Sequence, residues 1–430
     1  MKIKNNYFLV VFSAIIIGLS QHSLSLGFLA WFGLVPLLYV ILNQNSYKSI
    51  FKFSFLWGFI YNLIVLFWIA MNVGTILPIA IISMLCAVLI MSFNSILTCL
   101  IWYRIQNIFP HLRLIIFPVI WTSVEFIRSY GILGFPWISL ANSQIDYLYL
   151  IQNAEITGIY GITFWVVMIN ILIYQIFFEN KDRLLTIYAA VIFIFPWFFG
   201  YFLYSKTNSP ENNTSLSVTL IQPNINLINK RDFKVKDIIL DDLIEESNLS
   251  IEKGSRLIIW PESAVPFHRL QFASQRERII NEMLGDNDTY LLTGNIIREI
   301  PDTYNSSILF NKDGVKGIYH KRQPVPLAEY VPLSSTFNYL KKINIGSANF
   351  SKGEEDKVFR IDGVAFTSMI CFESTFPEIN RRHVQKGADA LVYLVNDGWY
   401  ENEPEPTQHA RQAIYRAIEN RRPVIRCANT

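Results

Sequence analysis

Long apolar runs fill the first half of the sequence, and short polar connections separate them. Seven of these runs reach or approach the roughly 20 residues that an α-helix needs to cross a bilayer. We place the helices at residues 8–24, 27–43, 54–74, 78–103, 112–129, 160–178 and 184–204. The pattern therefore predicts a polytopic α-helical membrane domain over residues 1–205.

Beyond a polar hinge at residues 206–214, short β-branched or apolar runs alternate with stretches of helical spacing. This alternation predicts an α/β domain with a mixed sheet over residues 215–430. Turn residues at 311–314 and 362–363 separate pairs of strands. The expected helices cover residues 232–251, 271–285 and 405–420, and the expected strands are SLSVTLIQ, RLIIW, TYLLTG, SSILF, VAFTSMI, ALVYLVN and PVIRC.

Charged residues are divided unevenly between the two halves. Residues 1–205 hold 14 of the 71 Asp, Glu, Lys and Arg side chains, and residues 206–430 hold the other 57. The net charge of +3 is small for 430 residues, and no basic stripe is interleaved with aromatic residues. The sequence therefore gives no indication of a nucleic-acid partner.

Basic residues in the connections predict the orientation of the membrane domain. With a cytoplasmic N-terminus, the outer connections near residue 25, near residue 75 and over 130–159 contain no Lys or Arg. Because basic residues resist transfer across the membrane, seven crossings place residues 206–430 outside the cytoplasm. A cleaved signal peptide at the N-terminus is the alternative. The inner connections contain Lys2, Lys4, Lys48, Lys52, Arg104, Arg113, Lys181 and Arg183.

One outer connection, residues 131–150 with Trp137, is long and aromatic. It is either an interfacial aromatic belt or an arm on the membrane that shapes a lipid entry. Just before it, Glu125 and Arg128 share a helical face at a spacing of three residues. A mutual ion pair is the default interpretation, and contact of Arg128 with an anionic phosphate is the functional one. We expect Arg128 and Trp137 to be the substrate-binding residues of this half.

Three segments of the second half combine a strand end with a reactive side chain. Glu262 follows the strand RLIIW, Lys321 and Glu329 flank a proline-rich loop, and Cys371 follows VAFTSMI. Active-site groups of α/β folds gather at strand ends, so one shared pocket is expected. Taken singly, a Glu or Lys is more often a surface residue, and a Cys after an apolar run more often belongs to the core.

Cys371 is placed where a strand ends and the helical segment STFPEINRRHVQKG begins. Backbone N–H groups and the positive end of a helix dipole at this point favour the thiolate. A nearby carboxylate could accept the proton, and a fixed lysine could stabilise an oxyanion, so Glu, Lys and Cys together could perform acyl transfer. Cys427, inside a strand run, is a rival nucleophile that we interpret as structural. The cysteines form no disulfide framework, and the six histidines show no metal-binding motif.

These three segments, in this order, resemble the nitrilase superfamily, whose members carry a Glu, Lys, Cys triad on an αββα sandwich. Together with the membrane half, the sequence is similar to the apolipoprotein N-acyltransferase family of the bacterial inner membrane over nearly its whole length. The motifs that carry this resemblance are EFIRSYGILGFPWISLANSQID, WPESAVP, DTYNS, PLAEYVP, ICFE and VNDGWY.

The resemblance implies that Glu262 is the general base, Lys321 the oxyanion-stabilising cation and Cys371 the nucleophile. Glu329, Glu373 and Asn305 match supporting positions of the family and complete the expected catalytic site. The implied reaction is ping-pong: a phospholipid ester acylates Cys371, and the α-amino group of a lipoprotein's diacylglyceryl-cysteine then attacks the thioester. Neither a cofactor nor a metal takes part. The implied location is the inner membrane, with a periplasmic catalytic domain.

The family pattern continues with more strands and a last transmembrane helix, which the sequence ending at Thr430 lacks, so we expect a fragment or a truncated product. At NKRDF the family commonly has an aromatic residue after the Lys, where this sequence has Arg231. Two rival functions stay open. One is a membrane-tethered amidase with the same triad, and the other is an inactive homologue that binds lipid.

Overall fold

The structure, a computed structural model, divides the chain into two compact units. Unit one comprises residues 1–209 with 402–419, and unit two comprises residues 210–401 with 420–430. The predicted hinge lies outside the described residues from position 207 onward, as do Arg113, Lys181 and Arg231. The structure describes residues 2–22, 24–112, 114–131, 133–179, 182–206, 215–230, 232–285, 287–331, 349–400 and 402–430.

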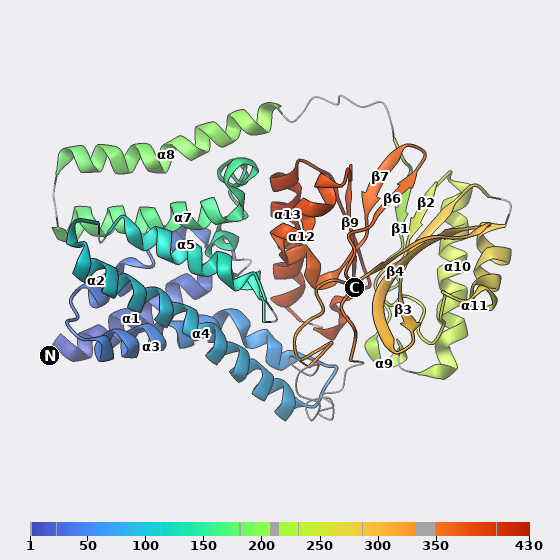
Figure 1. Ribbon diagram of the computed structural model, residues 1–430, viewed down its shortest axis with the longest axis horizontal. Coiled ribbons are helices and arrows are strands. Elements are labelled where there is room, and N and C mark those ends of the chain that lie inside the picture. Colours follow the sequence, from blue (N-terminus) through green and yellow to red (C-terminus); the bar gives the residue numbers. More distant parts are fainter. Residues whose placement is uncertain are drawn as a thin grey trace. The chain divides into compact units, whose positions relative to one another are not determined.

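Unit one is helical, as the apolar runs predict (Figure 1). Among the described residues, four helices are long and apolar enough to cross a membrane: Tyr47–Met71, Leu77–Ile108, Ala154–Glu179 and Arg183–Lys206. They include the helices α3 (Tyr47–Leu66), α4 (Leu77–Ile108), α7 (Ala154–Tyr174) and α8 (Arg183–Lys206), and they correspond to four of the seven predicted spans.

The other three predicted spans correspond to shorter helices. These are α1 (Lys2–Ser20), the pair η1 (Gly27–Trp31) and α2 (Val35–Leu42), and α5 (Ile116–Arg128). The 13 residues of α5 extend about 20 Å, which is less than the thickness of a bilayer core of about 30 Å. The number of crossings and the orientation therefore stay predictions.

Between α5 and α7 the chain forms short helical turns, η4 (Pro136–Ile138), η5 (Leu140–Gln144) and α6 (Leu148–Ile151). The following helix α8 approaches α6 closely at Gly200. A Cβ atom there would lie 1.7 Å from the Tyr149 carbonyl oxygen, so only glycine permits this approach.

The helix α13 (Glu405–Asn420) lies where helical spacing predicts it, but most of it belongs to unit one. Its Tyr415 hydroxyl donates to the Ala141 carbonyl at 2.6 Å, and the Ile159 N–H donates to Glu419 at 2.8 Å. The compact units therefore differ from a division into residues 1–205 and 215–430, because a late helix packs with the helical half.

The described residues of unit two form three sheets (Figure 1). In the largest, β1 (Val218–Leu220), β2 (Leu257–Ile259) and β3 (Tyr290–Glu299) are parallel neighbours, and β4 (Asp302–Asn311) and β5 (Gly314–His320) extend the sheet antiparallel. The second has the parallel order β10 (Val424–Ala428), β9 (Leu391–Val395) and β8 (Met369–Ile370). The third pairs β6 (Val358–Ile361) with β7 (Val364–Thr367).

Both predicted turns join antiparallel strands. Asn311 pairs with Gly314 at the β4–β5 turn, and Ile361 pairs with Val364 across the turn of β6 and β7. The short helices of unit two are α9 (Leu227–Lys230), α11 (Ala273–Ile279) and α12 (Pro377–Gln385), and the longest is α10 (Lys236–Glu252).

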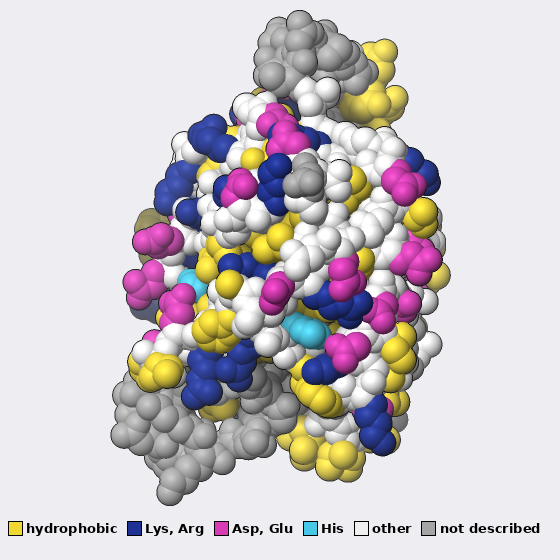
Figure 2. Space-filling model, turned by 90° about the vertical axis from the view of Figure 1, so that its right-hand side faces the viewer, with side chains coloured by type: hydrophobic (Ala, Val, Ile, Leu, Met, Phe, Trp, Pro, Cys, Tyr) yellow, Lys and Arg dark blue, Asp and Glu magenta, His cyan; other side chains and the backbone are white. Residues whose placement is uncertain are grey.

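The large sheet packs its apolar side chains against α10 and α11, which lie together on one side of it (Figure 1). Leu240 and Leu243 of α10 and Ile279 of α11 share one buried cluster with Trp260 and Phe310 of the sheet. The side of unit two that carries these helices shows interspersed acidic and basic residues (Figure 2). Such a mixture is typical of a solvated surface.

The large sheet and the β8–β10 sheet also contact each other. The buried Cys427 thiol donates to the carbonyls of Ile221 and Ile259 at 3.4 and 3.3 Å, and Ser307 of β4 donates to the Ser368 carbonyl at 3.4 Å. Two sheets packed together with helices outside form the nitrilase-like α/β architecture that the sequence predicts. Cys427 lies between the two sheets, which agrees with the interpretation that this cysteine is structural.

Candidate active site

The predicted catalytic residues lie at strand ends within unit two. Glu262 comes after β2, Lys321 directly follows β5, and Cys371 directly follows β8. Glu262 approaches β3 so closely that a Cβ atom on Gly294 would lie 2.6 Å from the Glu262 Cα atom. The backbone at Glu262 can approach β3 this closely because Gly294 has no side chain.

A buried lysine joins two carboxylates in this site. The Lys321 side chain is 1% exposed, and its Nζ atom lies 2.9 Å from Glu329 Oε1 and 3.7 Å from Glu262 Oε1. Asn305 Nδ2 donates to both carboxylates, at 2.7 Å to Glu262 and 3.0 Å to Glu329. The second Glu329 oxygen accepts from the Val325 N–H at 2.7 Å. These contacts fix the lysine and both acids relative to one another.

The charges of this cluster set the proton affinities of its members. Burial lowers the pKa of Lys321, but the Glu329 and Glu262 carboxylates outweigh burial and raise it above its ordinary value. Burial raises the pKa of Glu262, and Lys321 opposes that rise. The site therefore holds a permanently charged ammonium beside a carboxylate that is a stronger base than an exposed glutamate.

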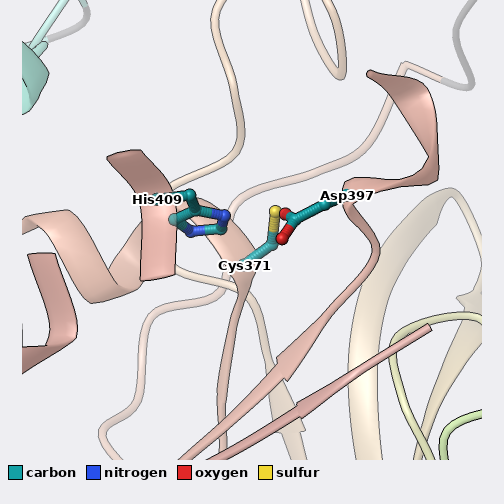
Figure 3. A group of neighbouring side chains, drawn as sticks. All are labelled: Cys371, Asp397 and His409. Atoms are coloured by element: carbon teal, nitrogen blue, oxygen red, sulfur yellow. The ribbon is translucent and has the colours of Figure 1, made fainter. Parts of the chain in front are cut away.

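Cys371 occupies a strained turn between β8 and the 3₁₀ helix η10 (Cys371–Thr375), with a φ of 50°. A non-glycine residue in this left-handed region is uncommon, and such strain is concentrated at functional sites. The thiol and the Asp397 carboxylate, at the end of β9, point toward each other within 4.8 Å (Figure 3). Cys371 also interacts electrostatically with Glu262 and Lys321.

The prediction that this position favours the thiolate is wrong. Burial raises the pKa of the Cys371 thiol well above its usual value, and the negative charges of Glu262 and Asp397 add to the rise, against the opposing effect of Lys321. Burial and the two negative charges therefore raise the thiol pKa by more than the dipole of a short helical turn lowers it. The raised pKa favours the protonated thiol, so a nucleophilic role for Cys371 would require a base that removes its proton.

Glu373 fixes the two segments that carry Lys321 and Cys371. Its Oε1 atom accepts from the Tyr319 hydroxyl at 2.7 Å and from the Arg322 and Gln323 N–H groups at 2.7 and 3.2 Å. Its Oε2 atom accepts from the Ile370 N–H at 2.8 Å. One buried carboxylate thus joins the segment after β5 to the turn that carries Cys371.

The sequence analysis assigned no role to two charged groups of the site, Lys230 and Asp397. Lys230, at the end of α9, is buried, and its Nζ atom lies 3.5 Å from the Glu262 carbonyl oxygen. Burial lowers the pKa of Lys230 to about 8, although Glu262 opposes the decrease. Asp397 pairs with Arg426. The sequence signals for Asp397 were its place after the strand ALVYLVN and its presence in the motif VNDGWY, but no role was assigned to it.

Arg128 and Trp137 belong to unit one. Trp137 is buried, its ring centre lies 5.1 Å from that of Trp68 in a tilted arrangement, and its Nε1 atom donates to Gln408 at 2.9 Å. It lines a cavity of about 20 Å³ that also includes Gln21. Arg128 lines a separate cavity. Their role in binding substrate stays a prediction.

The prediction of an ion pair between Glu125 and Arg128 is wrong, because these two described residues form no salt bridge with each other. Glu125 instead accepts hydrogen bonds from Trp121 Nε1, Ser139 Oγ and Thr163 Oγ1 at 3.1, 2.7 and 2.8 Å, and from the Leu140 N–H at 3.0 Å. These donors satisfy the carboxylate without the guanidinium.

Within unit two, Cys371 and Asp397 supply one thiol and one carboxylate that could approach a metal ion. The polar groups of the site are instead arranged around Lys321, which already provides a fixed positive charge.

Family comparisons cover both units. The family model described as apolipoprotein N-acyltransferase N-terminal domain matches residues 13–172, and that described as carbon-nitrogen hydrolase matches residues 217–430. Among solved structures, a mutant of an amidase of the nitrilase superfamily from Nesterenkonia is 18% identical, with a TM-score of 0.39, covering 50% of this chain and 77% of the amidase. That distant likeness carries no functional conclusion.

Curated relatives match nearly the full length. An apolipoprotein N-acyltransferase of Chlorobaculum tepidum is 30% identical, covering 99% of this chain and 85% of the relative. The enzyme of that name from Haemophilus influenzae is also 30% identical, covering 94% of this chain and 79% of the relative. Since these relatives span the helical half and the α/β half together, the chain belongs to the apolipoprotein N-acyltransferase family, which are acyltransferases with a carbon-nitrogen hydrolase domain.

Proposed function

We propose that this protein transfers an acyl chain from a phospholipid to the α-amino group of the diacylglyceryl-cysteine of a bacterial lipoprotein. The observation that carries the proposal is the buried Lys321, held between Glu262 and Glu329 and within electrostatic reach of Cys371. This constellation supplies a base, a nucleophile and a fixed cation, and it occurs in a family whose members are named for this reaction.

In the first step, Glu262 accepts the Cys371 proton as the sulfur attacks the ester carbonyl of the phospholipid. The carbonyl π electrons move to oxygen, and the Lys321 ammonium stabilises this oxyanion. When the tetrahedral intermediate collapses, the C–O bond breaks. The departing lysophospholipid oxygen takes the proton from Glu262, and a thioester stays on Cys371.

In the second step, the lipoprotein amine attacks the thioester carbonyl and gives a proton to Glu262. The C–S bond breaks, the amide forms, and the Cys371 sulfur recovers its proton. A raised pKa suits Glu262 to this double task, because it must accept a proton from a thiol or an amine and return it in each half-reaction. The reaction needs no cofactor.

Asn305, Glu329 and Glu373 are positioning residues in this proposal. Asn305 holds the two carboxylates in one orientation, and Glu329 fixes the lysine through a 2.9 Å contact. Glu373 anchors the backbone on both sides of the reacting groups. Such fixed geometry is worth several orders of magnitude in rate, because the reacting atoms need no search for alignment.

We place the reaction at the bacterial inner membrane. The four long apolar helices support membrane insertion. The distribution of Lys and Arg in the connections supports a cytoplasmic N-terminus and a periplasmic catalytic domain. The partners are then a phospholipid donor and a diacylglyceryl lipoprotein acceptor, which both reach the protein through the bilayer.

The test is acyl transfer by the purified chain in detergent micelles. Phosphatidylethanolamine labelled in its acyl chains is incubated with a diacylglyceryl lipopeptide, and the products are identified by mass spectrometry. We expect a labelled amide on the lipopeptide, none with Cys371→Ser, and none when the lipopeptide amine is acetylated beforehand. Release of ammonia from small amides without lipopeptide acylation would instead identify an amidase and contradict the proposal.

A further inference from the structure

Lys230 is a buried lysine that has no task in the two half-reactions proposed above. It ends α9 and is 7% exposed, and its Nζ atom donates to the Glu262 carbonyl oxygen at 3.5 Å. An ammonium group carries three N–H donors, and a buried charge is costly unless its partners offset the cost. One contact of this length, to an uncharged carbonyl, offsets only part of it. A buried cation beside the proposed base is therefore a candidate for a role in the reaction.

The segment that carries Lys230 is fixed by Asn429, a fully buried residue after β10. The Asn429 carbonyl accepts from the Asn224 N–H at 2.8 Å. The Asn429 side chain accepts from the Ile225 N–H at 3.3 Å and donates to the Ile225 carbonyl at 2.9 Å. The Lys230 N–H then donates to the Asn226 carbonyl at 3.1 Å, within the turn of α9. The lysine therefore extends from a backbone that is held in place.

The backbone of Glu262 is strained and confined. The Gly294 N–H of β3 donates to the Pro261 carbonyl at 3.2 Å, next to the close approach of Gly294 to Glu262. Ser263 has a φ of 51°, a left-handed conformation that is uncommon for a residue with a side chain. Such a conformation persists only where surrounding contacts hold it. The Glu262 carbonyl belongs to the peptide bond before Ser263, so its contact with Lys230 acts on this strained point.

Charge also links Lys230 to Glu262. Burial raises the pKa of Glu262; among the charged groups that act on it, Lys321 opposes the rise, Glu329 adds to it and Lys230 opposes it. Glu262 is in turn the charged group that acts on Lys230, whose pKa burial lowers to about 8. Lys230 therefore carries its charge at neutral pH and loses it as the pH rises through about 8, whereas the raised pKa of Lys321 keeps that lysine charged.

We propose that Lys230 is a positioning residue for the base Glu262, because its ammonium holds the Glu262 carbonyl and favours the ionised Glu262 side chain. Lys321 approaches the side-chain oxygen of the base, and Lys230 acts from its backbone. When Lys230 loses its proton, Glu262 loses one favourable charge and becomes a stronger base. This role rests on the proposed function only in that Glu262 serves as the base for Cys371.

The test measures acyl-enzyme formation from phosphatidylethanolamine by the full chain, as intact mass between about pH 4 and 10. In Lys230→Met, the acid limb of the profile should move to higher pH, because Glu262 loses a cation that favours its ionised form. The plateau rate should fall about tenfold, because the carbonyl of the base is no longer held. Lys234→Met, which removes an exposed lysine of η7 (Phe233–Val235), is the matched control and should behave as the parent does.

Lys230→Arg separates the charge of the lysine from its titration. Because arginine stays charged, the acid limb of this variant should stay at the parental pH. The parental rate should rise a second time near pH 8, where Lys230 loses its proton, and this rise should be absent from both Lys230→Arg and Lys230→Met. An acid limb of Lys230→Met that stays in place or moves to lower pH would overturn the proposal, as would a rise near pH 8 that persists in both variants.

Alkylation of Cys371 by iodoacetamide, located by peptide mass, gives a second readout that needs no phospholipid. Its acid limb should move in Lys230→Met in the same direction. A Lys230-dependent alkylation profile without acyl transfer would refute the proposed function and keep the role of Lys230. Acyl transfer with both profiles independent of Lys230 would refute the role and keep the function. Lys230→Met should fold, because it removes a buried charge; if Lys230→Arg does not fold, the acid limb of Lys230→Met decides alone.

Discussion

Replacement of Glu329 by glutamine tests the electrostatic account of the base. The substitution keeps the size of the side chain and lets its oxygen accept from Lys321 and Asn305, but it removes one negative charge beside Glu262. The Glu329 carboxylate contributes to the raised pKa of Glu262. Without it, Glu262 should lose its proton at lower pH and become a weaker base for the Cys371 thiol.

The geometry of Asn305 sets the size of this effect. Its Nδ2 atom lies 2.7 Å from a Glu262 oxygen and 3.0 Å from a Glu329 oxygen, so the two oxygens are less than about 6 Å apart. At an effective dielectric constant of about 20, two unit charges at this distance repel by about 3 kcal/mol, so loss of the Glu329 charge should lower the pKa of Glu262. Spreading of charge over both carboxylate oxygens reduces this repulsion but does not change the direction of the effect on the pKa of Glu262.

The assay is the rate of acyl-enzyme formation at low phospholipid concentration, followed by quenching and intact mass between about pH 4 and 9. In Glu329→Gln the acid limb of the profile should move to lower pH, and the plateau rate should fall about tenfold because the base is weaker. Glu378→Gln, at an acidic residue of α12 that pairs with Arg381, is the control. An acid limb that stays in place or moves up would refute the reasoning.

Three further substitutions test the supporting structure. Gly294→Ala places a Cβ atom 2.6 Å from the Glu262 Cα atom, so acyl-enzyme formation should fall at least about tenfold as the base is displaced; parental rates would contradict the close approach. Lys230, with a pKa of about 8, is neutral in the folded protein between about pH 8 and 10.5, where the unfolded chain still binds the proton. The contribution of Lys230 to the free energy of unfolding therefore rises with pH over that window, by at most roughly 3 kcal/mol. Lys230→Met should abolish the accompanying rise in unfolding temperature. Glu373→Gln should turn an amide N–H₂ toward the Ile370 N–H and cost about 1–3 kcal/mol, with a slower reaction but an unshifted pH profile; a shifted profile would indicate a direct electrostatic role.

Local patterns predicted most of the fold. Strand runs, turn residues and helical spacing each depend on neighbouring residues, and the turns at 311–314 and 362–363 formed where the sequence placed them. The position of Cys371 at a strand end was predictable for the same reason. Assignment of its partners required the family resemblance, because Glu262 lies 109 positions away along the chain.

Interactions between distant residues explain the wrong predictions. The spacing of Glu125 and Arg128 favours an ion pair, but Ser139 and Thr163, 14 and 38 residues away from Glu125, take the carboxylate instead. The helix-dipole argument for a Cys371 thiolate considered only its own turn. Burial by surrounding elements and the carboxylate of Glu262 dominate, and neither is visible in a local pattern.

The covalent state of Cys371 tests the central claim most directly. The purified chain is incubated with phosphatidylethanolamine without any acceptor, and its intact mass is measured before and after hydroxylamine, which cleaves thioesters. We expect one acyl adduct on the parent and on Cys427→Ser, its removal by hydroxylamine, and no adduct on Cys371→Ser. An adduct that persists in Cys371→Ser, or a folded parent that forms none while still binding phospholipid, would contradict the account.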